Sequence, residues 1–120
     1  MQIADPETRL SAALTETYAY YQRTERLQLT SARDLPELPA MQRVMEPYFA
    51  YFKRVRDGLA EGWGTPGEQH ARLCAVLAHV LDFRTWYDFV RQQHLSDDEL
   101  VTLMVQFVRC LVSEGEEGAS

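Results

Sequence analysis

The chain of 120 residues has only two cysteines, and no apolar run approaches the roughly 20 residues that a membrane-spanning helix needs. Acidic residues outnumber basic ones by 18 to 12, which gives a formal net charge of −6. Cys74 and Cys110 lie in apolar surroundings, which favours buried thiols in a reducing compartment; a disulfide is the alternative. The N-terminus lacks a basic segment followed by an apolar one, so we expect no secretory signal, no membrane partner and a cytoplasmic location.

The motifs of several enzyme classes are absent as well. The three histidines and the acidic residues show no metal-ligand spacing, so we expect no metal and no cofactor. Cys74 precedes His79 by five residues, a helical rotation that points the two side chains apart and argues against a nucleophile–base pair. The segment GWGTPG (62–67) lacks the lysine and the preceding strand of a phosphate-binding loop. We therefore expect no catalytic activity.

What the chain does contain is helical periodicity with clear start and stop signals. The segment DPE (5–7) supplies an N-cap, a first-turn proline and an acid, and it predicts a helix from residue 6 to about residue 30. Pro47 interrupts the next apolar stripe, so we expect a short helix to about Met45 and another that opens at Pro47. Gly62 is suited to a left-handed cap at its end, with Trp63 folded back onto the last turn.

Two capping boxes mark the helices of the second half. TPGE (65–68) and SDDE (96–99) each place Thr or Ser three residues before Glu. They predict one long helix over 66–93 and a last helix that ends near Ser113. No segment alternates with period two, so the expected fold class is all-α, a bundle of about five helices. We assign residues 1–114 to one helical domain and 115–120 to a flexible acidic tail.

The last predicted helix is apolar around most of its circumference. A surface helix needs only one apolar stripe, so this helix requires cover on two sides. We predict a homodimer in which the last two helices of each chain form a four-helix interface; a central position in a monomeric bundle is the alternative. The residues predicted at the interface are Val101, Met104, Val105, Val108 and Val112.

The segments DGLAEGWG (57–64) and AHVLDFRTWYDFVRQQHLSDDELVTLMVQFVRC (78–110) resemble the regulatory domain of TetR-type bacterial transcription regulators. RLSAALTETYAYYQRTERLQLTSARDLPELP (9–39) resembles the first long helices of that domain. The resemblance implies a domain that binds a small effector among its helices and dimerises through its last two helices. Those regulators also carry an N-terminal DNA-binding domain that has no counterpart here. We therefore expect a fragment, or a natural relative without that domain, and no direct DNA binding by this negatively charged chain.

Aromatic side chains at helical spacing are the candidates for an effector pocket. HVLDFRTWYDFV (79–90) carries several rings and one histidine, which suits a small apolar or aromatic effector with one polar group. We expect His79 to be the polar contact. The alternatives are that each residue packs as core, and that the chain is a purely structural homodimerisation or protein-interaction module. The predicted ligand-binding residues are Tyr18, Tyr21, Met45, Tyr48, His79, Phe83 and Trp86.

Overall fold

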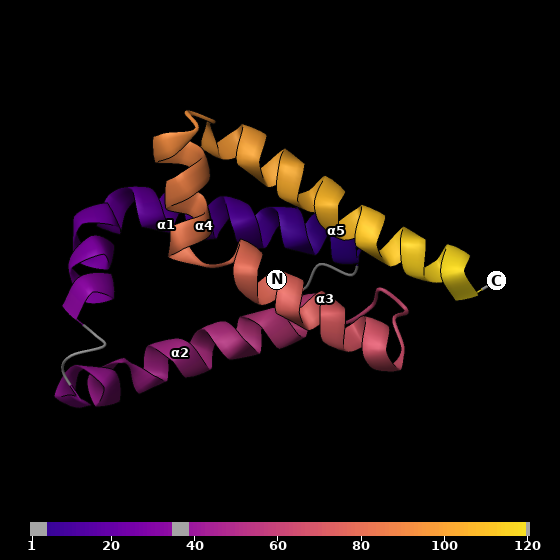
Figure 1. Ribbon diagram of the computed structural model, residues 1–120, viewed down its shortest axis with the longest axis horizontal. Coiled ribbons are helices and arrows are strands. Elements are labelled where there is room, and N and C mark those ends of the chain that lie inside the picture. The colour runs from indigo at the N-terminus through magenta and orange to yellow at the C-terminus, as the bar shows by residue number, and fades with distance from the viewer. Residues whose placement is uncertain (1–4, 35–38, 120) are drawn as a thin grey trace.

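The computed structural model describes residues 5–34 and 39–119, with side chains for 5–30, 43 and 45–113. Over these ranges it has helices and no strand, which confirms the predicted all-α bundle (Figure 1). No helix in the described ranges combines the length and the apolar character that crossing a bilayer demands. The elements are α1 (Pro6–Asp34), α2 (Pro39–Ala60), α3 (Gly67–Val80), α4 (Phe83–Tyr87), the π-helical η2 (Asp88–Gln92) and α5 (Asp97–Ala119).

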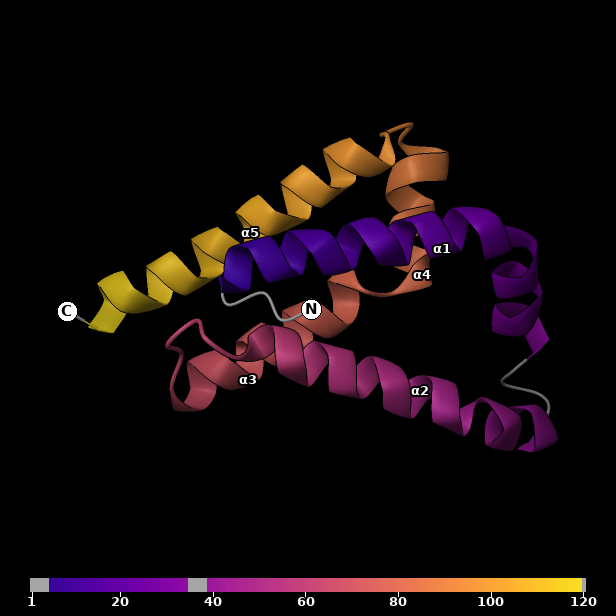
Figure 2. The ribbon, with the colours of Figure 1, turned by 180° about the vertical axis from the view of Figure 1, so that it is seen from behind.

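The first helix lies in the middle of the bundle. Figures 1 and 2 show α1 between α5 and α2, and α3 packs against both α2 and α5. Its apolar positions recur at spacings of four, four and three, so one face of the helix is buried along its length. The centre of the core consists of Leu10, Leu14, Tyr18 and Tyr21 of α1, Leu73 and Leu77 of α3, Trp86 of α4, and Leu100 and Val108 of α5.

Two predicted helix starts are confirmed. The Asp5 carboxylate accepts the backbone N–H of Thr8 at 2.8 Å, which caps α1. At α5, the Ser96 hydroxyl accepts the N–H of Glu99 at 3.1 Å, and the Glu99 carboxylate accepts the N–H of Ser96 at 3.1 Å. Both caps are local interactions, because the bonded residues lie within one helical turn of each other.

The turn between α2 and α3 is also formed largely as predicted. Gly62 has φ 87°, and the Trp63 indole N–H donates to the Leu59 carbonyl at 2.9 Å, so the ring folds back onto α2. The capping box predicted just after this turn is wrong. Helix α3 begins at Gly67, and its N-cap residue is Pro66, which makes no side-chain capping bond.

Helix α2 runs through Pro47 without ending, so the predicted break at that residue is wrong. Proline removes one backbone hydrogen bond and crowds the preceding turn, which usually kinks or ends a helix. Pro47 is exposed to solvent, so water can bond the carbonyl that loses its partner. The cost of the proline is thereby reduced on this side of the helix.

Helix α1 extends beyond its predicted end and bends at Thr24. The backbone there has φ −117° and ψ 18°, outside helical values. The Thr24 hydroxyl donates to the Tyr20 carbonyl at 2.8 Å, a side-chain bond that competes with the helical ladder and bends helices. The last part of α1 consequently turns toward the start of α2 (Figures 1 and 2).

The single helix predicted over 66–93 is wrong, because the chain breaks between α3 and α4. Asp82 is extended, with φ −73° and ψ 141°. The carbonyls freed by the break are capped by α1: the Tyr18 hydroxyl donates to Val80 O at 2.7 Å, and the Tyr21 hydroxyl donates to Leu81 O at 2.5 Å. Both bonds are buried. The break is therefore fixed by residues about 60 positions away in the sequence.

The last helix continues past Ser113, where the sequence predicts its end. The backbone is helical to Ala119, so most of the predicted 115–120 tail belongs to α5. Residue 120 lies outside the described residues.

Replacing Tyr18 or Tyr21 by Phe should lower the free energy of unfolding by about 1–3 kcal/mol each. Each change leaves a buried carbonyl without its hydrogen-bond donor while keeping the ring. Urea denaturation followed by circular dichroism measures the change. Tyr51→Phe is the control, because Tyr51 is 55% exposed and its replacement should change the urea denaturation midpoint little. Equal midpoints for all three variants would contradict the capping role.

Candidate ligand-binding cleft

A partly open cleft of 610 Å³ lies where the bent end of α1 faces α2 and the break between α3 and α4. We call it the aromatic cleft. Its volume falls within the range of about 300–1,000 Å³ typical of small-molecule sites. The lining residues are Tyr21, Gln28, Leu29, Met45, Tyr48, Phe49, Phe52, Lys53, Arg56, Ala78, Leu81, Asp82, Phe83, Arg84, Tyr87, Asp88 and Gln92.

Six aromatic rings form the walls of the aromatic cleft. On α2, the Tyr48 ring lies 4.8 Å from Phe52 and 5.8 Å from Phe49, centroid to centroid. Across the cleft, Tyr21 meets Phe83 edge to face at 5.4 Å. Phe49 stays 46% exposed although it is large and apolar. These rings offer flat surfaces that the protein itself leaves partly uncovered.

Two tyrosine hydroxyls provide polar points in the cleft. The Gln28 amide lies 3.5 Å from the Tyr48 hydroxyl, which is also within hydrogen-bonding reach of the Tyr21 hydroxyl. Burial raises the pKa of both tyrosines above the ordinary value, so both hydroxyls remain neutral at physiological pH. The cleft therefore presents uncharged hydrogen-bonding groups at its inner end.

Charged side chains of both signs line the cleft. The cations are Lys53, Arg56 and Arg84, and the anions are Asp82 and Asp88. Arg56 is paired with neighbouring Asp57 at 3.0 Å; in the part of the chain with described side chains, the other four form no ion pair. The two remaining cations and the two anions balance, so the charges alone do not select an anionic or a cationic ligand.

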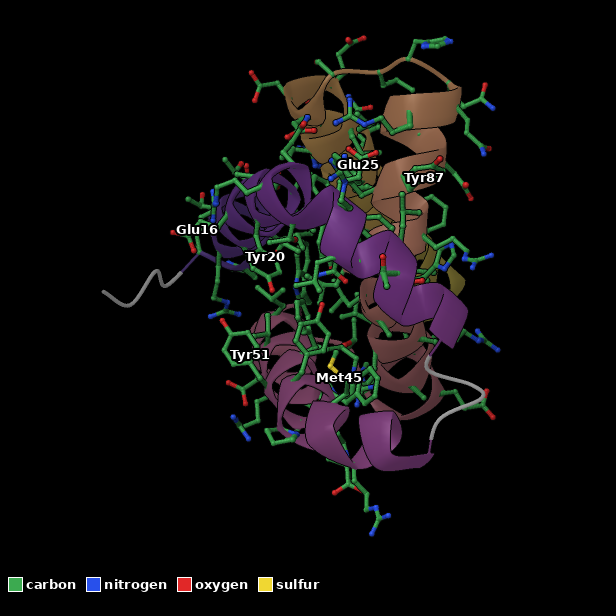
Figure 3. All side chains as sticks on the ribbon, turned by 90° about the vertical axis from the view of Figure 1, so that its left-hand side faces the viewer. Glu16, Tyr20, Glu25, Met45, Tyr51 and Tyr87 are labelled. Carbon is green, nitrogen blue, oxygen red and sulfur yellow. The ribbon has the colours of Figure 1, made fainter. Side chains whose placement is uncertain are left out.

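Four of the seven predicted ligand-binding residues line the cleft: Tyr21, Met45, Tyr48 and Phe83. Figure 3 shows Met45 pointing from α2 toward the bent end of α1, whereas Tyr51 lies on another side of the same helix. The structure thus brings together residues from the first helix, the second helix and the segment after the break.

Tyr18 and Trp86 lie outside the cleft, in the core. Both are fully buried, and Tyr18 is engaged in capping the broken helix. The Trp86 indole N–H donates to the Asp97 carboxylate at 2.9 Å, and the Arg91 guanidinium lies 5.1 Å from the ring centroid. Trp86 therefore joins α4 to the start of α5 and has no free face toward the cleft.

His79 is exposed and does not line the cleft. Its Nε2 lies 3.4 Å from the Thr85 hydroxyl, which donates to the His79 carbonyl at 2.7 Å. The predicted polar contact assumed one continuous helix. Helix α3 ends at Val80, one residue after His79, and the break at Asp82 changes the direction of the chain, so His79 and Phe83 do not share a face.

Several lining residues were not predicted as ligand contacts. Phe49 lies four residues and Phe52 seven residues after Met45, so their helical spacing could have placed them on the same face. Gln28 reaches the cleft only because α1 bends at Thr24. No pattern in the sequence marks that bend, since Thr15 in the same helix also bonds the carbonyl four residues earlier and keeps helical backbone angles.

All five residues predicted at a dimer interface are buried within this chain, at 7% exposure or less. Because α5 packs on both α1 and α3, its own chain covers those side chains. The apolar residues left on its outer face are Leu103, 38% exposed, and Phe107, 53% exposed. Arg109, on the same helix, is ion-paired with Glu7 of α1.

Comparison with protein-family models, curated proteins and solved structures finds no match for the chain. Within the described ranges, no three His, Cys, Asp or Glu side chains are grouped closely enough to hold a metal ion. The geometry of the aromatic cleft is therefore the basis for any functional proposal.

The free energy of unfolding should fall as the pH rises above about 10. Burial raises the pKa of Tyr18 and Tyr21 in the folded chain, so the stabilisation is present below the unfolded value near 10 and is lost above it. Each protonated tyrosine contributes a slope of about 1.4 kcal/mol per pH unit. Urea denaturation at several pH values should give a shallower slope for Tyr21→Phe than for the unmodified chain. Identical slopes would contradict the prediction.

Proposed function

We propose that this chain is a regulatory domain that binds a small apolar or aromatic molecule in the aromatic cleft. The observation that carries the proposal is a 610 Å³ cleft whose lining includes six aromatic rings. A bundle filled by its own side chains would not leave a ring such as Phe49 half exposed beside such a cleft. The resemblance to TetR-type bacterial transcription regulators supports the same class of function.

The polar contact for the ligand would come from Tyr48 and Gln28. Both line the cleft, and the Tyr48 hydroxyl is a neutral donor or acceptor. A hydroxyl or carbonyl group on a flat apolar body would match this arrangement, because the rings cover the body while the hydroxyl fixes its orientation. His79 has no place in this proposal.

A ligand in the cleft would act directly on the helix break. Leu81, Asp82 and Phe83 line the cleft, and Tyr21 both lines it and caps the Leu81 carbonyl. A ligand that changes the position of Tyr21 would therefore change how α4 is held against α1. Ligand binding in the proposed domain would in this way change the position of α4.

Phe49→Ala should abolish most ligand-induced stabilisation while leaving the fold intact. Phe49 is a partly exposed cleft wall, so its loss removes ligand contact more than core packing. Thermal melting with a panel of flat aromatic compounds tests this, because a compound at about 100 times its Kd adds about 2.7 kcal/mol of stability. Tyr51→Ala is the matched control: Tyr51 is a 55% exposed ring on the same helix, and it lies outside the cleft. A panel in which no compound stabilises the unmodified chain would count against the proposal.

The second candidate function is self-association, and it is favoured by one observation. Leu103 and Phe107 are spaced four residues apart on the outer face of α5, and both are exposed. Such a pair on one helix face can pack against its counterpart in a symmetric dimer. We propose a homodimer through this face in place of the buried residues predicted from the sequence. DNA binding by this chain alone has no support, given the net charge of −6.

Leu103→Glu combined with Phe107→Glu should convert the proposed dimer to a folded monomer. Val105→Glu should instead unfold the chain, since Val105 is 7% exposed and a charge there is buried without a partner. Light scattering gives the mass, and circular dichroism gives the helix content. A monomeric unmodified chain at micromolar concentration would contradict the dimer.

A further inference from the structure

A threonine, a histidine and a cysteine form a short hydrogen-bonded chain at the start of α3. The Cys74 sulfur lies 3.6 Å from His70 Nε2, and His70 Nδ1 lies 3.3 Å from the Thr65 hydroxyl. His70 is exposed and Cys74 is half-buried. The aromatic cleft includes none of the three.

The local fold explains why these side chains meet. His70 and Cys74 are four residues apart, so they lie on the same face of α3. Because α3 starts at Gly67, the Thr65 hydroxyl is not needed as a helix cap and contacts the imidazole instead. The pair was not predicted, because Cys74 was considered only with the later His79.

A hollow of 380 Å³ lies beside His70 at the turn between α2 and α3. Gly62 and Gly64 line this hollow, and their φ values of 87° and 71° are left-handed conformations that glycine adopts readily. A small molecule can therefore approach the imidazole from this hollow. Its lining residues are Ala60, Glu61, Gly62, Gly64, Thr65, Pro66 and His70.

We propose that Cys74 is a modification site for small α,β-unsaturated carbonyl compounds, with His70 as the base and Thr65 as the residue that orients it. When Nδ1–H is donated to the Thr65 hydroxyl, Nε2 presents its lone pair to the thiol. A thiol is a poor nucleophile until it loses its proton, and a neighbouring imidazole can accept that proton. This site is independent of ligand binding in the aromatic cleft.

The reaction is an addition that needs no oxidant and releases no leaving group. His70 Nε2 takes the thiol proton as the Cys74 sulfur bonds to the β-carbon of the unsaturated carbonyl. The π electron pair of the carbon–carbon double bond moves to the α-carbon and its carbonyl, as an enolate. The imidazolium then returns the proton to the α-carbon, which leaves a thioether on Cys74 and a neutral His70.

The test uses acrylamide as the unsaturated carbonyl and a Cys110→Ser background, so that Cys74 is the only thiol. Intact-mass spectrometry follows the labelling rate at pH 7, and peptide mapping confirms the position. Because general bases typically contribute about 100-fold or more, we expect His70→Gln to slow labelling by at least roughly tenfold at this exposed site. Thr65→Val should lower the labelling rate by a smaller factor, since it leaves the imidazole in place and removes only its hydrogen-bond partner.

Two controls separate the base from a structural role. His79→Gln changes another exposed histidine of the same helix and should leave the labelling rate unchanged. His70→Ala should regain activity toward acrylamide when free imidazole is added, because the adjacent hollow can admit it. Loosening of the fold cannot mimic the expected result, since it would expose Cys74 and speed labelling.

Equal labelling rates for the His70→Gln variant and its parent, with matching melting curves, would overturn the proposal. Slow labelling of His70→Ala that free imidazole does not restore would overturn the role of His70 as a base. Neither result would bear on the aromatic cleft, whose ligands are assayed separately by thermal stabilisation.

Discussion

The arrangement of this bundle depends on two tyrosine hydroxyls that cap a broken helix. An extended residue at Asp82 frees the carbonyls of Val80 and Leu81 inside the core, where an unpaired carbonyl is costly. Tyr18 and Tyr21 supply the missing donors from α1. The same bonds therefore hold α1 against the α3–α4 junction and set the direction in which α4 leaves. They also position Tyr21 and the residues around Asp82 as one side of the aromatic cleft.

The parts of the fold that could be predicted are those determined by near neighbours in the sequence. The caps at Asp5 and Ser96 and the return of Trp63 onto Leu59 each involve residues within four positions. The break at Asp82 could not be predicted, because the groups that satisfy it belong to a distant helix. Local signals thus identified the elements, whereas tertiary hydrogen bonds determined where one of them is interrupted.

In the candidate site, too, the residues that depend on local helical spacing could be predicted, and those that depend on distant contacts could not. Met45 and Tyr48 could be found from the helical spacing of an apolar stripe, because α2 is continuous through that region. His79 could not be placed correctly, since its predicted face depended on an unbroken helix. The outward face of α5 was likewise misjudged: an apolar helix shows that cover is needed, but it does not identify which neighbour supplies it. Here α1 and α3 cover most of it.

The packing of α1 against α5 bears on how the chain acquires its structure during synthesis. Among the helices of this bundle, α1 is synthesised before the others, and much of its cover comes from α5, which is synthesised last of them (Figure 1). Glu7 and Arg109, which join the two helices, are 102 positions apart. Until α5 emerges, the apolar face of α1 has no partner of its own chain along that side and is open to chaperones and to other nascent chains. Folding of this domain is consequently completed after translation of its final helix, not progressively from the N-terminus.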